Sequence, residues 1–202
     1  MPAGCGRLVL ITGATAAGKT TVGHEVAALL PRAVHVDGDD IHRLVVSGAV
    51  GFDLPPPPGA VEQLMLRYSA AMAVSSIYRH AGFDAVLTDN IFEAHLTGLL
   101  FLAFADMPAE PAHVVVLDPP VDAIRRRYQA RPGGGYGDTI TPDELTRAVA
   151  RTLRIGLWLD NGAQTPADTA AEIVSRLAEA AVTQQDLLGR LNAPPAPDAS
   201  RG

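Results

Sequence analysis

One glycine-rich stretch near the start of the chain limits the fold more than any other feature. Residues 13–20 read Gly-Ala-Thr-Ala-Ala-Gly-Lys-Thr, the G-x-x-x-x-G-K-T pattern of a phosphate-binding loop, or P-loop. The apolar run at residues 7–12 has the character of a buried parallel strand. A helical pattern follows the loop, with Val22, Val26, Leu29 and Leu30 on one side. Because strand, glycine turn and helix occur in this order, the sequence predicts a P-loop in its proper structural context.

The chemistry of phosphate binding explains the residues of this loop. Gly13 and Gly18 permit backbone angles that a side chain would forbid. The N–H groups of the loop then point inward at the positive end of the helix dipole and hold the β-phosphate of ATP. Lys19 is expected to bridge the β- and γ-phosphates, and the Thr20 hydroxyl to bind Mg²⁺. The alternative is a glycine-rich turn that binds nothing. The predicted ATP-binding residues of the loop are Gly13, Ala14, Thr15, Ala16, Ala17, Gly18, Lys19, Thr20 and Thr21.

Composition narrows the choice of partner and location. The chain has 202 residues, of which 48% are hydrophobic and 19% charged, as in a globular domain with a full core. A formal net charge of -6 argues against a nucleic-acid partner held by phosphate contacts. The single cysteine, Cys5, excludes an internal disulfide and fits a reducing compartment. No targeting signal and no membrane-spanning stretch is evident. We therefore expect a cytoplasmic protein without nucleic-acid or membrane partners, and a homodimer is left open.

Strand and helix patterns alternate along the whole chain. After the P-loop, strand patterns lie at residues 33–37, 85–89, 113–117 and 157–160. Helical patterns lie at about residues 40–47, 61–81, 95–106, 120–131, 141–154, 165–181 and 184–191. This order predicts an α/β chain with the three-layer P-loop NTPase fold and a five-stranded parallel sheet. We expect a single domain over residues 1–191, with a lid segment at about 127–141 and a disordered tail at 192–202.

Acidic residues follow the ends of three predicted strands. Ligands of such sheets bind beyond the carboxyl ends of the strands, so these side chains are expected at one rim. Asp37, Asp39 and Asp40 follow the second strand, and close carboxylates raise one another's pKa, which suits a base. Alternatively this turn only caps a helix, with Asp40 as the expected cap. Asp89 ends the third strand. At the end of the last strand, Asp160 is expected to contact the adenine of ATP, with Asn161 and Gly162 beside it as further candidates.

Beyond the P-loop, several short motifs resemble small-molecule kinases of the nucleoside-monophosphate-kinase-like group. Residues 37–43 read Asp-Gly-Asp-Asp-Ile-His-Arg, similar to the D-G-D-x-x-R stretch of adenylylsulfate kinase and the G-D-D-x-H stretch of gluconate kinase. Residues 87–92 look like the D-x-x-F stretch of chloramphenicol phosphotransferase. Arg127 and Arg131 resemble the R-x-x-x-R pair at the lid entry of these kinases. The resemblance is architectural over residues 7–181, and it does not carry over the identity of the substrate.

The resemblance implies roles for particular side chains. Asp39 matches a carboxylate that orients or deprotonates the acceptor hydroxyl. Asp89 matches an acid that holds Mg²⁺ through water, and a surface turn is its alternative. Arg127 and Arg131 are one helical turn apart, so they share a face. One of them would stabilise the transferring phosphoryl group and the other would bind ATP, unless the pair is simply a solvated helix end.

The loop at residues 48–59 carries four consecutive prolines and matches none of these families closely. A long stiff loop inside a compact domain is more often functional than filler. Arg43 and Arg67 are candidate substrate-holding residues, with a solvated helix arginine as the alternative. The predicted acceptor-binding residues are Asp37, Asp39, Asp40, Arg43, Phe52, Leu54, Gln63, Arg67 and Asp89.

These observations predict an ATP- and Mg²⁺-dependent kinase that phosphorylates a hydroxyl of a small molecule. The apolar residues of the proline-rich loop favour an acceptor with an apolar part, such as an antibiotic or other natural product. A sugar, a nucleoside, a sulfate nucleotide or, for a zeta-toxin-like enzyme, a nucleotide sugar is the alternative acceptor. A non-catalytic P-loop switch is the alternative class, although the sequence shows no clear water-orienting glutamine for it.

Overall fold

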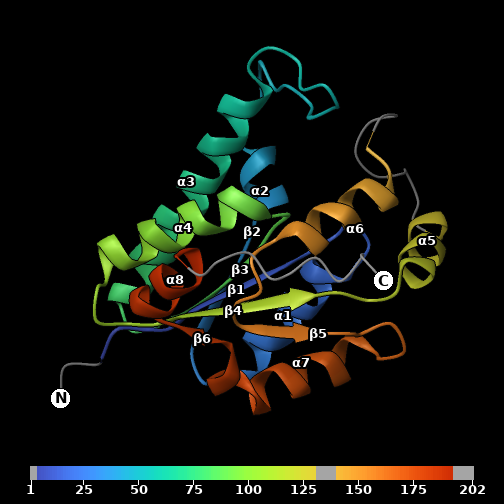
Figure 1. Ribbon diagram of the computed structural model, residues 1–202. Coiled ribbons are helices and arrows are strands. Elements are labelled where there is room, and N and C mark those ends of the chain that lie inside the picture. Colours follow the sequence, from blue (N-terminus) through green and yellow to red (C-terminus); the bar gives the residue numbers. More distant parts are fainter. Residues whose placement is uncertain (1–3, 131–139, 193–202) are drawn as a thin grey trace.

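The computed structural model describes residues 4–130 and 140–192. Five parallel strands form its sheet in the order β2-β3-β1-β4-β5. Strand β1, which leads into the P-loop, is the central strand (Figure 1). The P-loop therefore lies in the middle of the rim that the carboxyl ends of the strands form. The prediction of a three-layer α/β fold with five parallel strands is therefore confirmed. The strands are β1 Leu8–Gly13, β2 Ala33–Asp37, β3 Asp84–Thr88, β4 Ala112–Leu117 and β5 Leu157–Leu159.

Helices cover both faces of the sheet, and alternate residues of β1 show the two layers. Leu8 and Leu10 pack into a core with α3, α4, α6 and α8, whereas Val9 and Ile11 pack into a second core with α1 and α7. All four side chains are fully buried, as a central parallel strand requires. The helices are α1 Lys19–Leu29, α2 Gly38–Arg43, α3 Ala60–His80, α4 Glu93–Asp106, α5 Val121–Gln129, α6 Pro142–Arg151, α7 Pro166–Ser175 and α8 Gln184–Leu191.

The chain departs from expectation after α7. The predicted helix through residue 181 ends at Ser175, and a short 3-10 helix η1 Leu177–Ala180 and strand β6 Ala181–Val182 follow. Arg176 explains the break. Its guanidinium donates hydrogen bonds to the carboxylates of Glu172 in α7 and Glu179 in η1, which holds the chain in a tight turn. Strand β6 pairs antiparallel with β4, a sixth strand that two residues are too few to predict.

The acidic turn after β2 is also built differently from the expectation. Asp37, not Asp40, is the N-cap of α2: its Oδ1 accepts a hydrogen bond of 2.8 Å from the backbone N–H of Asp39. Helix α2 ends at Arg43 rather than near residue 47. Asp37 holds the cap position because it is the last residue of β2 and still has extended backbone, which an N-cap residue needs.

Several expected features fall outside the described residues. Arg131 and most of the predicted lid lie in the interval 131–139, and the predicted tail lies almost entirely in 193–202. Among the described helices, none combines the length and apolar character needed to cross a membrane.

Two glycines give opposite stability predictions. Gly156 has φ +70°, and a Cβ added there would lie 2.3 Å from the backbone oxygen of Val114. Gly156→Ala should therefore lower the free energy of unfolding by about 2–4 kcal/mol. Gly98 lies in α4 with open space around it, so Gly98→Ala should raise the free energy of unfolding by about 0.5–1 kcal/mol. Urea unfolding of both variants checks this, and a loss of stability at Gly98 larger than at Gly156 would contradict it.

Candidate functional site: two adjoining pockets

The P-loop has the backbone that its glycines predict. Gly13 has φ +152° and Gly18 has φ +100°, and a Cβ on Gly13 would lie 2.5 Å from the backbone oxygen of Leu117 on β4. Gly18 precedes α1 directly, so the loop ends at a helix N-terminus. The ammonium group of Lys19 lies back over the loop and donates a hydrogen bond of 3.0 Å to the backbone oxygen of Ala14. The loop can therefore receive phosphate groups with backbone N–H groups and a cation together.

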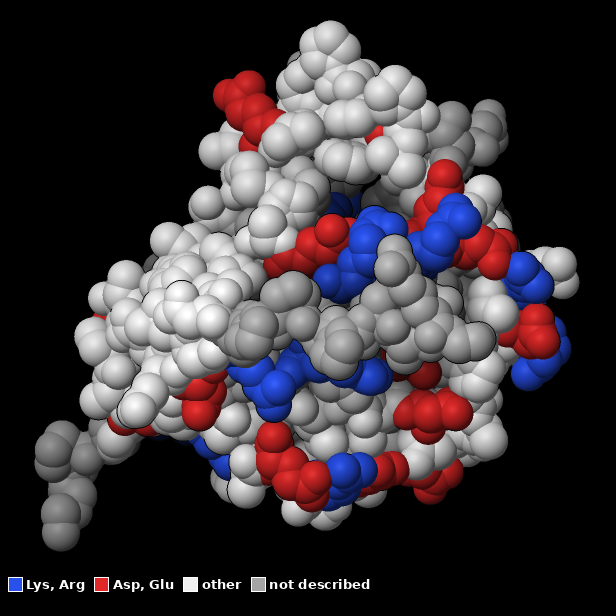
Figure 2. All heavy atoms as spheres, viewed as in Figure 1, with Lys and Arg blue, Asp and Glu red and all other residues white. Residues whose placement is uncertain are grey.

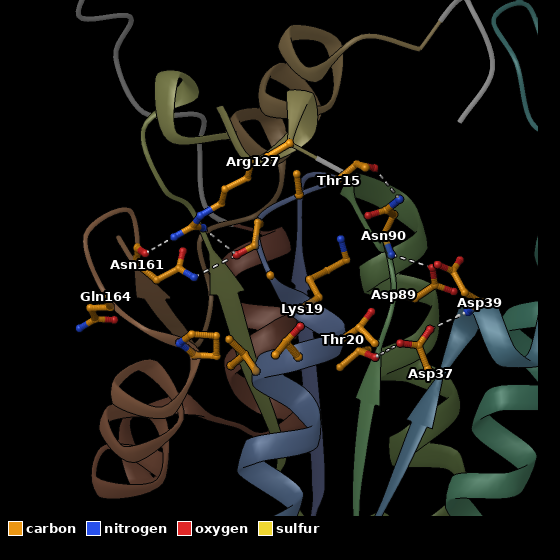
Figure 3. Close-up of a pocket in the computed structure, with 18 residues that line it drawn as sticks. Thr15, Lys19, Thr20, Asp37, Asp39, Asp89, Asn90, Arg127, Asn161 and Gln164 are labelled. Carbon is orange, nitrogen blue, oxygen red and sulfur yellow. Dashed lines mark hydrogen bonds between the residues drawn. The ribbon is translucent and has the colours of Figure 1, made fainter. Parts of the chain in front are cut away.

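A cavity of about 530 Å³, here called the P-loop pocket, opens above this loop. The loop residues 15–21 form its floor, and polar residues from the ends of β2, β3 and β5 form its walls (Figure 3). The polar wall residues are Asp37, Asp39, Thr88, Asp89, Asn90, Arg127, Asn161 and Gln164. Gly13 and Ala14 shape the loop without lining the cavity.

The three carboxylates of the acidic turn have different surroundings. Asp37 is buried, caps α2 and accepts a hydrogen bond of 3.2 Å from the Thr88 hydroxyl. Asp39 faces the P-loop pocket with 42% of its side chain exposed. Asp40 is exposed and forms an ion pair with Arg43, and neither residue of that pair lines a described pocket. Of the three, Asp39 is therefore placed to meet a ligand.

Asp89 is the most constrained carboxylate of the site. Its Oδ1 accepts a hydrogen bond of 2.9 Å from Arg67 and another of 2.7 Å from the backbone N–H of Asn90. A Cβ on Gly38 would lie 1.9 Å from its Oδ2, so only glycine fits at that position. Burial raises the pKa of Asp89 to about 6, and the positive charges of Arg67 and Lys19 oppose this shift.

A metal site was predicted at Thr20 and Asp89. The described residues contain no group of three or more histidine, cysteine, aspartate or glutamate side chains able to hold a metal. Thr20 is exposed in the P-loop pocket, and the buried Oδ2 of Asp89 has no hydrogen-bond partner among the described residues. The residues fit a Mg²⁺ ion that would take the Thr20 hydroxyl, phosphates and water as ligands, with Asp89 reached through one of the waters, the usual binding mode of Mg²⁺.

Arg127 connects helix α5 to the P-loop. Its guanidinium donates hydrogen bonds of 3.3 Å to the backbone oxygen of Ala17 and 2.8 Å to that of Asn161. The Asn161 amide also donates to Ala17, at 2.9 Å. Asp160 is turned away and exposed, with its carboxylate accepting from the backbone N–H of Gly162, so Asn161 and not Asp160 lines the pocket. The predicted partner Arg131 lies outside the described residues.

A second cavity of about 650 Å³, here called the apolar pocket, lies beside the first. It contains four of the predicted acceptor-binding residues, Phe52, Leu54, Gln63 and Arg67. The Gln63 amide binds the proline-rich loop, donating to the backbone oxygen of Gly48 at 2.7 Å and accepting from Val50 at 2.9 Å. Sequence reasoning missed further residues of the pocket, because they come from α3, α4, α6 and the residues just before α4 and α6. These residues are Tyr68, Phe92, His95, Ile140, Leu145 and Ala148.

Comparison with known proteins identifies the fold. No protein-family model matches the chain, and no curated protein matches it by sequence. A sugar kinase from Janibacter sp. is 19% identical, with a TM-score of 0.62 over 87% of this chain and 96% of that one. A tunicamycin resistance protein from Deinococcus radiodurans is 13% identical, with a TM-score of 0.62 over 88% and 98%. The Mycobacterium tuberculosis APS kinase bound to AMPPNP and APS is 19% identical, with a TM-score of 0.59 over 87% and 99%. The chain has the fold of the P-loop small-molecule kinases.

The raised pKa of Asp89 predicts a pH-dependent stability. Its folded pKa of about 6 exceeds its unfolded value of about 3.9, so the folded state holds the extra proton between these values. Its contribution to stability therefore decreases as the pH rises from about 4 to about 6. The free energy of unfolding of the wild type minus that of Asp89→Asn should decrease over the same interval. Urea unfolding of both proteins at several pH values measures it.

Asp84 supplies a control of opposite sign. Burial alone would raise the pKa of Asp84, but hydrogen bonds from the side chain and backbone N–H of Arg7 outweigh it and lower the pKa. The ionised form then stabilises the folded state above the unfolded pKa, and this contribution is lost as the pH falls below about 4. The difference in the free energy of unfolding between wild type and Asp89→Asn should decrease with pH, and that between wild type and Asp84→Asn should increase. A difference for Asp89→Asn that stays constant or increases would contradict the raised pKa of Asp89.

Proposed function

We propose that the protein is an ATP-dependent phosphotransferase that moves the γ-phosphoryl group to a hydroxyl of a small molecule. This proposal rests on one observation: the polar P-loop pocket and the apolar pocket adjoin and share one wall. The P-loop pocket offers backbone N–H groups and cations for phosphates, and the apolar pocket offers a separate site for a second substrate. The kinase fold and the AMPPNP bound to the similar APS kinase support the same proposal.

The chemistry follows from the side chains of the P-loop pocket. The acceptor oxygen attacks the γ-phosphorus in line, and the bond from that phosphorus to the β–γ bridging oxygen breaks. Asp39 takes the proton of the hydroxyl, and Lys19 stabilises the charge that develops on the leaving phosphate. Bound Mg²⁺ would neutralise the phosphate oxygens, with Thr20 as a direct ligand and Asp89 acting through water. Arg127 would hold ATP against the loop it already contacts.

The apolar pocket supports an acceptor with an apolar body, such as an antibiotic or other natural product. Aromatic and aliphatic side chains form most of its wall, including Phe52, Tyr68, Phe92 and Leu145. Its volume of about 650 Å³ is in the range that encloses a drug-sized ligand. A compact sugar, nucleoside or nucleotide sugar would leave much of this apolar surface without contacts. Of the similar structures, the tunicamycin resistance protein fits this choice better than the sugar kinase.

A nucleotide-binding switch is the competing class, and the second pocket weighs against it because a switch needs no site for a small acceptor. We also propose that the protein works in the cytoplasm without nucleic acid or membrane, as a monomer or homodimer. The mixture of positive and negative side chains over the face in Figure 2, together with the net charge of -6, supports the absence of a nucleic-acid partner.

Transfer of labelled phosphate from ATP to a library of hydroxylated natural products tests the function. Lys19→Ala should abolish transfer while the protein stays folded, because Lys19 supplies the ammonium group nearest the phosphates. Asp39→Asn should lower kcat by roughly 10²–10⁴ and leave the ATP Kd within a few-fold. Asp40→Asn is the matched control, since Asp40 lines neither pocket, and it should keep its kcat. Normal turnover in Lys19→Ala, or a larger loss at Asp40 than at Asp39, would refute this assignment.

The apolar character of the acceptor has its own test. Phe52→Ala should raise the acceptor KM by about tenfold, the effect of losing about 1.4 kcal/mol of apolar contact, with kcat and ATP affinity nearly unchanged. Val46→Ala is the matched control, because Val46 is 95% exposed on the segment that leads into the same loop and lines neither pocket. An unchanged KM in Phe52→Ala would place the acceptor elsewhere.

A further inference from the structure

Asn90 is the only described residue that lines both pockets. It follows Asp89 at the end of β3, in the wall between the P-loop and the apolar pocket. The proposed phosphotransfer steps assign no role to the Asn90 side chain. Its position is nevertheless the one where a transferred phosphoryl group and an acceptor would meet.

The backbone of Asn90 is held from two sides. Its N–H donates a hydrogen bond of 2.7 Å to Oδ1 of Asp89, and its carbonyl oxygen accepts one of 2.5 Å from the Tyr68 hydroxyl on α3. Asp89 is in turn fixed by Arg67. The backbone from which the Asn90 side chain projects is therefore fixed before any ligand binds, which is part of the preorganisation that a binding residue needs.

The two ends of the Asn90 amide have different surroundings. Nδ2 donates a long hydrogen bond of 3.4 Å to the Thr15 hydroxyl of the P-loop. Oδ1 is buried and has no donor among the described residues. Figure 3 shows this side chain between those of Thr15 and Asp89. A buried acceptor without a donor destabilises the protein, so a ligand that brings a donor to Oδ1 recovers this free energy on binding.

We propose that Asn90 contacts both substrates: Nδ2 faces the γ-phosphate beside Thr15, and Oδ1 accepts a hydrogen bond from the acceptor. This inference rests on the proposed phosphotransfer. The proton of the reacting hydroxyl goes to Asp39, so the donor to Asn90 is a second group on the acceptor, a hydroxyl or an N–H near the reacting hydroxyl. Asn90 thereby selects acceptors that carry two neighbouring donors on an apolar body.

The nucleotide half is tested with Mg²⁺–AMPPNP and Mg²⁺–ADP as probes, by calorimetry at pH 8. Asn90→Asp puts a carboxylate where we place the γ-phosphate, so it should weaken AMPPNP at least tenfold more than ADP. Asn90→Leu has similar volume and no charge, and it removes the hydrogen bond from Nδ2. It should therefore weaken AMPPNP several-fold, less than Asn90→Asp does, and change the ADP Kd by less than threefold. Thermal melting verifies that each variant is folded; Asn90→Glu replaces an Asn90→Asp protein that is not, and Asn90→Ser replaces an Asn90→Leu protein that is not. An AMPPNP-to-ADP ratio unchanged from wild type in a folded Asn90→Asp protein would overturn the proposal.

The acceptor half uses whichever compound the transfer screen identifies, together with its analogue lacking the second donor. Asn90→Leu should lower kcat/KM about 10²-fold for the full compound and only a few-fold for the analogue, because the analogue never used Oδ1. An equal loss for both compounds would overturn the acceptor contact and leave only a structural role. If no compound in the screen is phosphorylated, the proposed function fails, while the AMPPNP-to-ADP ratio still decides whether Asn90 borders the γ-phosphate.

Discussion

The buried ion pair between Asp89 and Arg67 is the contact on which the two-pocket arrangement depends. Only 3% of the Asp89 side chain and 9% of the Arg67 side chain are exposed, and their atoms are 2.9 Å apart. Removing either partner would leave an uncompensated buried charge, which costs several kcal/mol. The pair ties helix α3 to the end of β3, and α3 carries one wall of the apolar pocket. Together with the hydrogen bond from Tyr68 to Asn90, the pair therefore sets where the two pockets adjoin.

The same pair bears on Arg67, which the sequence made a candidate substrate-holding residue. An arginine on a helix beside a substrate loop resembles a group that binds a ligand anion. In the structure its guanidinium contacts Asp89 and lies 3.9 Å from Asp39, so its charge is shared between two carboxylates of the protein. An acceptor bound in the apolar pocket meets the edge of a compensated ion pair rather than a cation. This agrees with an acceptor body that is apolar rather than anionic.

The sheet and the P-loop were predictable from the sequence because both depend on local patterns. Strand β1, the loop and helix α1 are contiguous, and each glycine has a backbone reason to be there. Asp39 and Asp89 were found for a related reason, since the carboxyl ends of parallel strands share one rim. The apolar pocket was predictable only in part. Phe52 and Leu54 stood out within an unusual loop, but the residues of α4 and α6 that oppose them carry no local mark.

Where the structure differs from the sequence-based predictions, the difference lies in the direction of side chains. The spacing of residues along the sequence does not determine that direction. Asp160 and Asn161 are neighbours at the end of β5, and the sequence favoured the charged residue. The turn after β5 points the Asp160 carboxylate at the N–H of Gly162, which leaves Asn161 to face the P-loop. Likewise Asp37 caps α2, which leaves Asp39, two residues further on, facing the pocket. In both turns one side chain satisfies the local backbone, and its neighbour is thereby available for a ligand.

The same arrangement occurs at the end of β3, where Asp89 bonds the protein and Asn90 lines the pockets. Asp89 satisfies the backbone N–H of Asn90 and the charge of Arg67, so the amide of Asn90 has no local task beyond its long contact to Thr15. A neutral amide suits this place better than a second carboxylate would. It adds no repulsion toward incoming phosphates, and it offers both donors and an acceptor at the wall that the two pockets share. Three strand ends thus share one arrangement, in which a carboxylate secures the turn or the helix and a polar residue one or two positions further on lines the P-loop pocket.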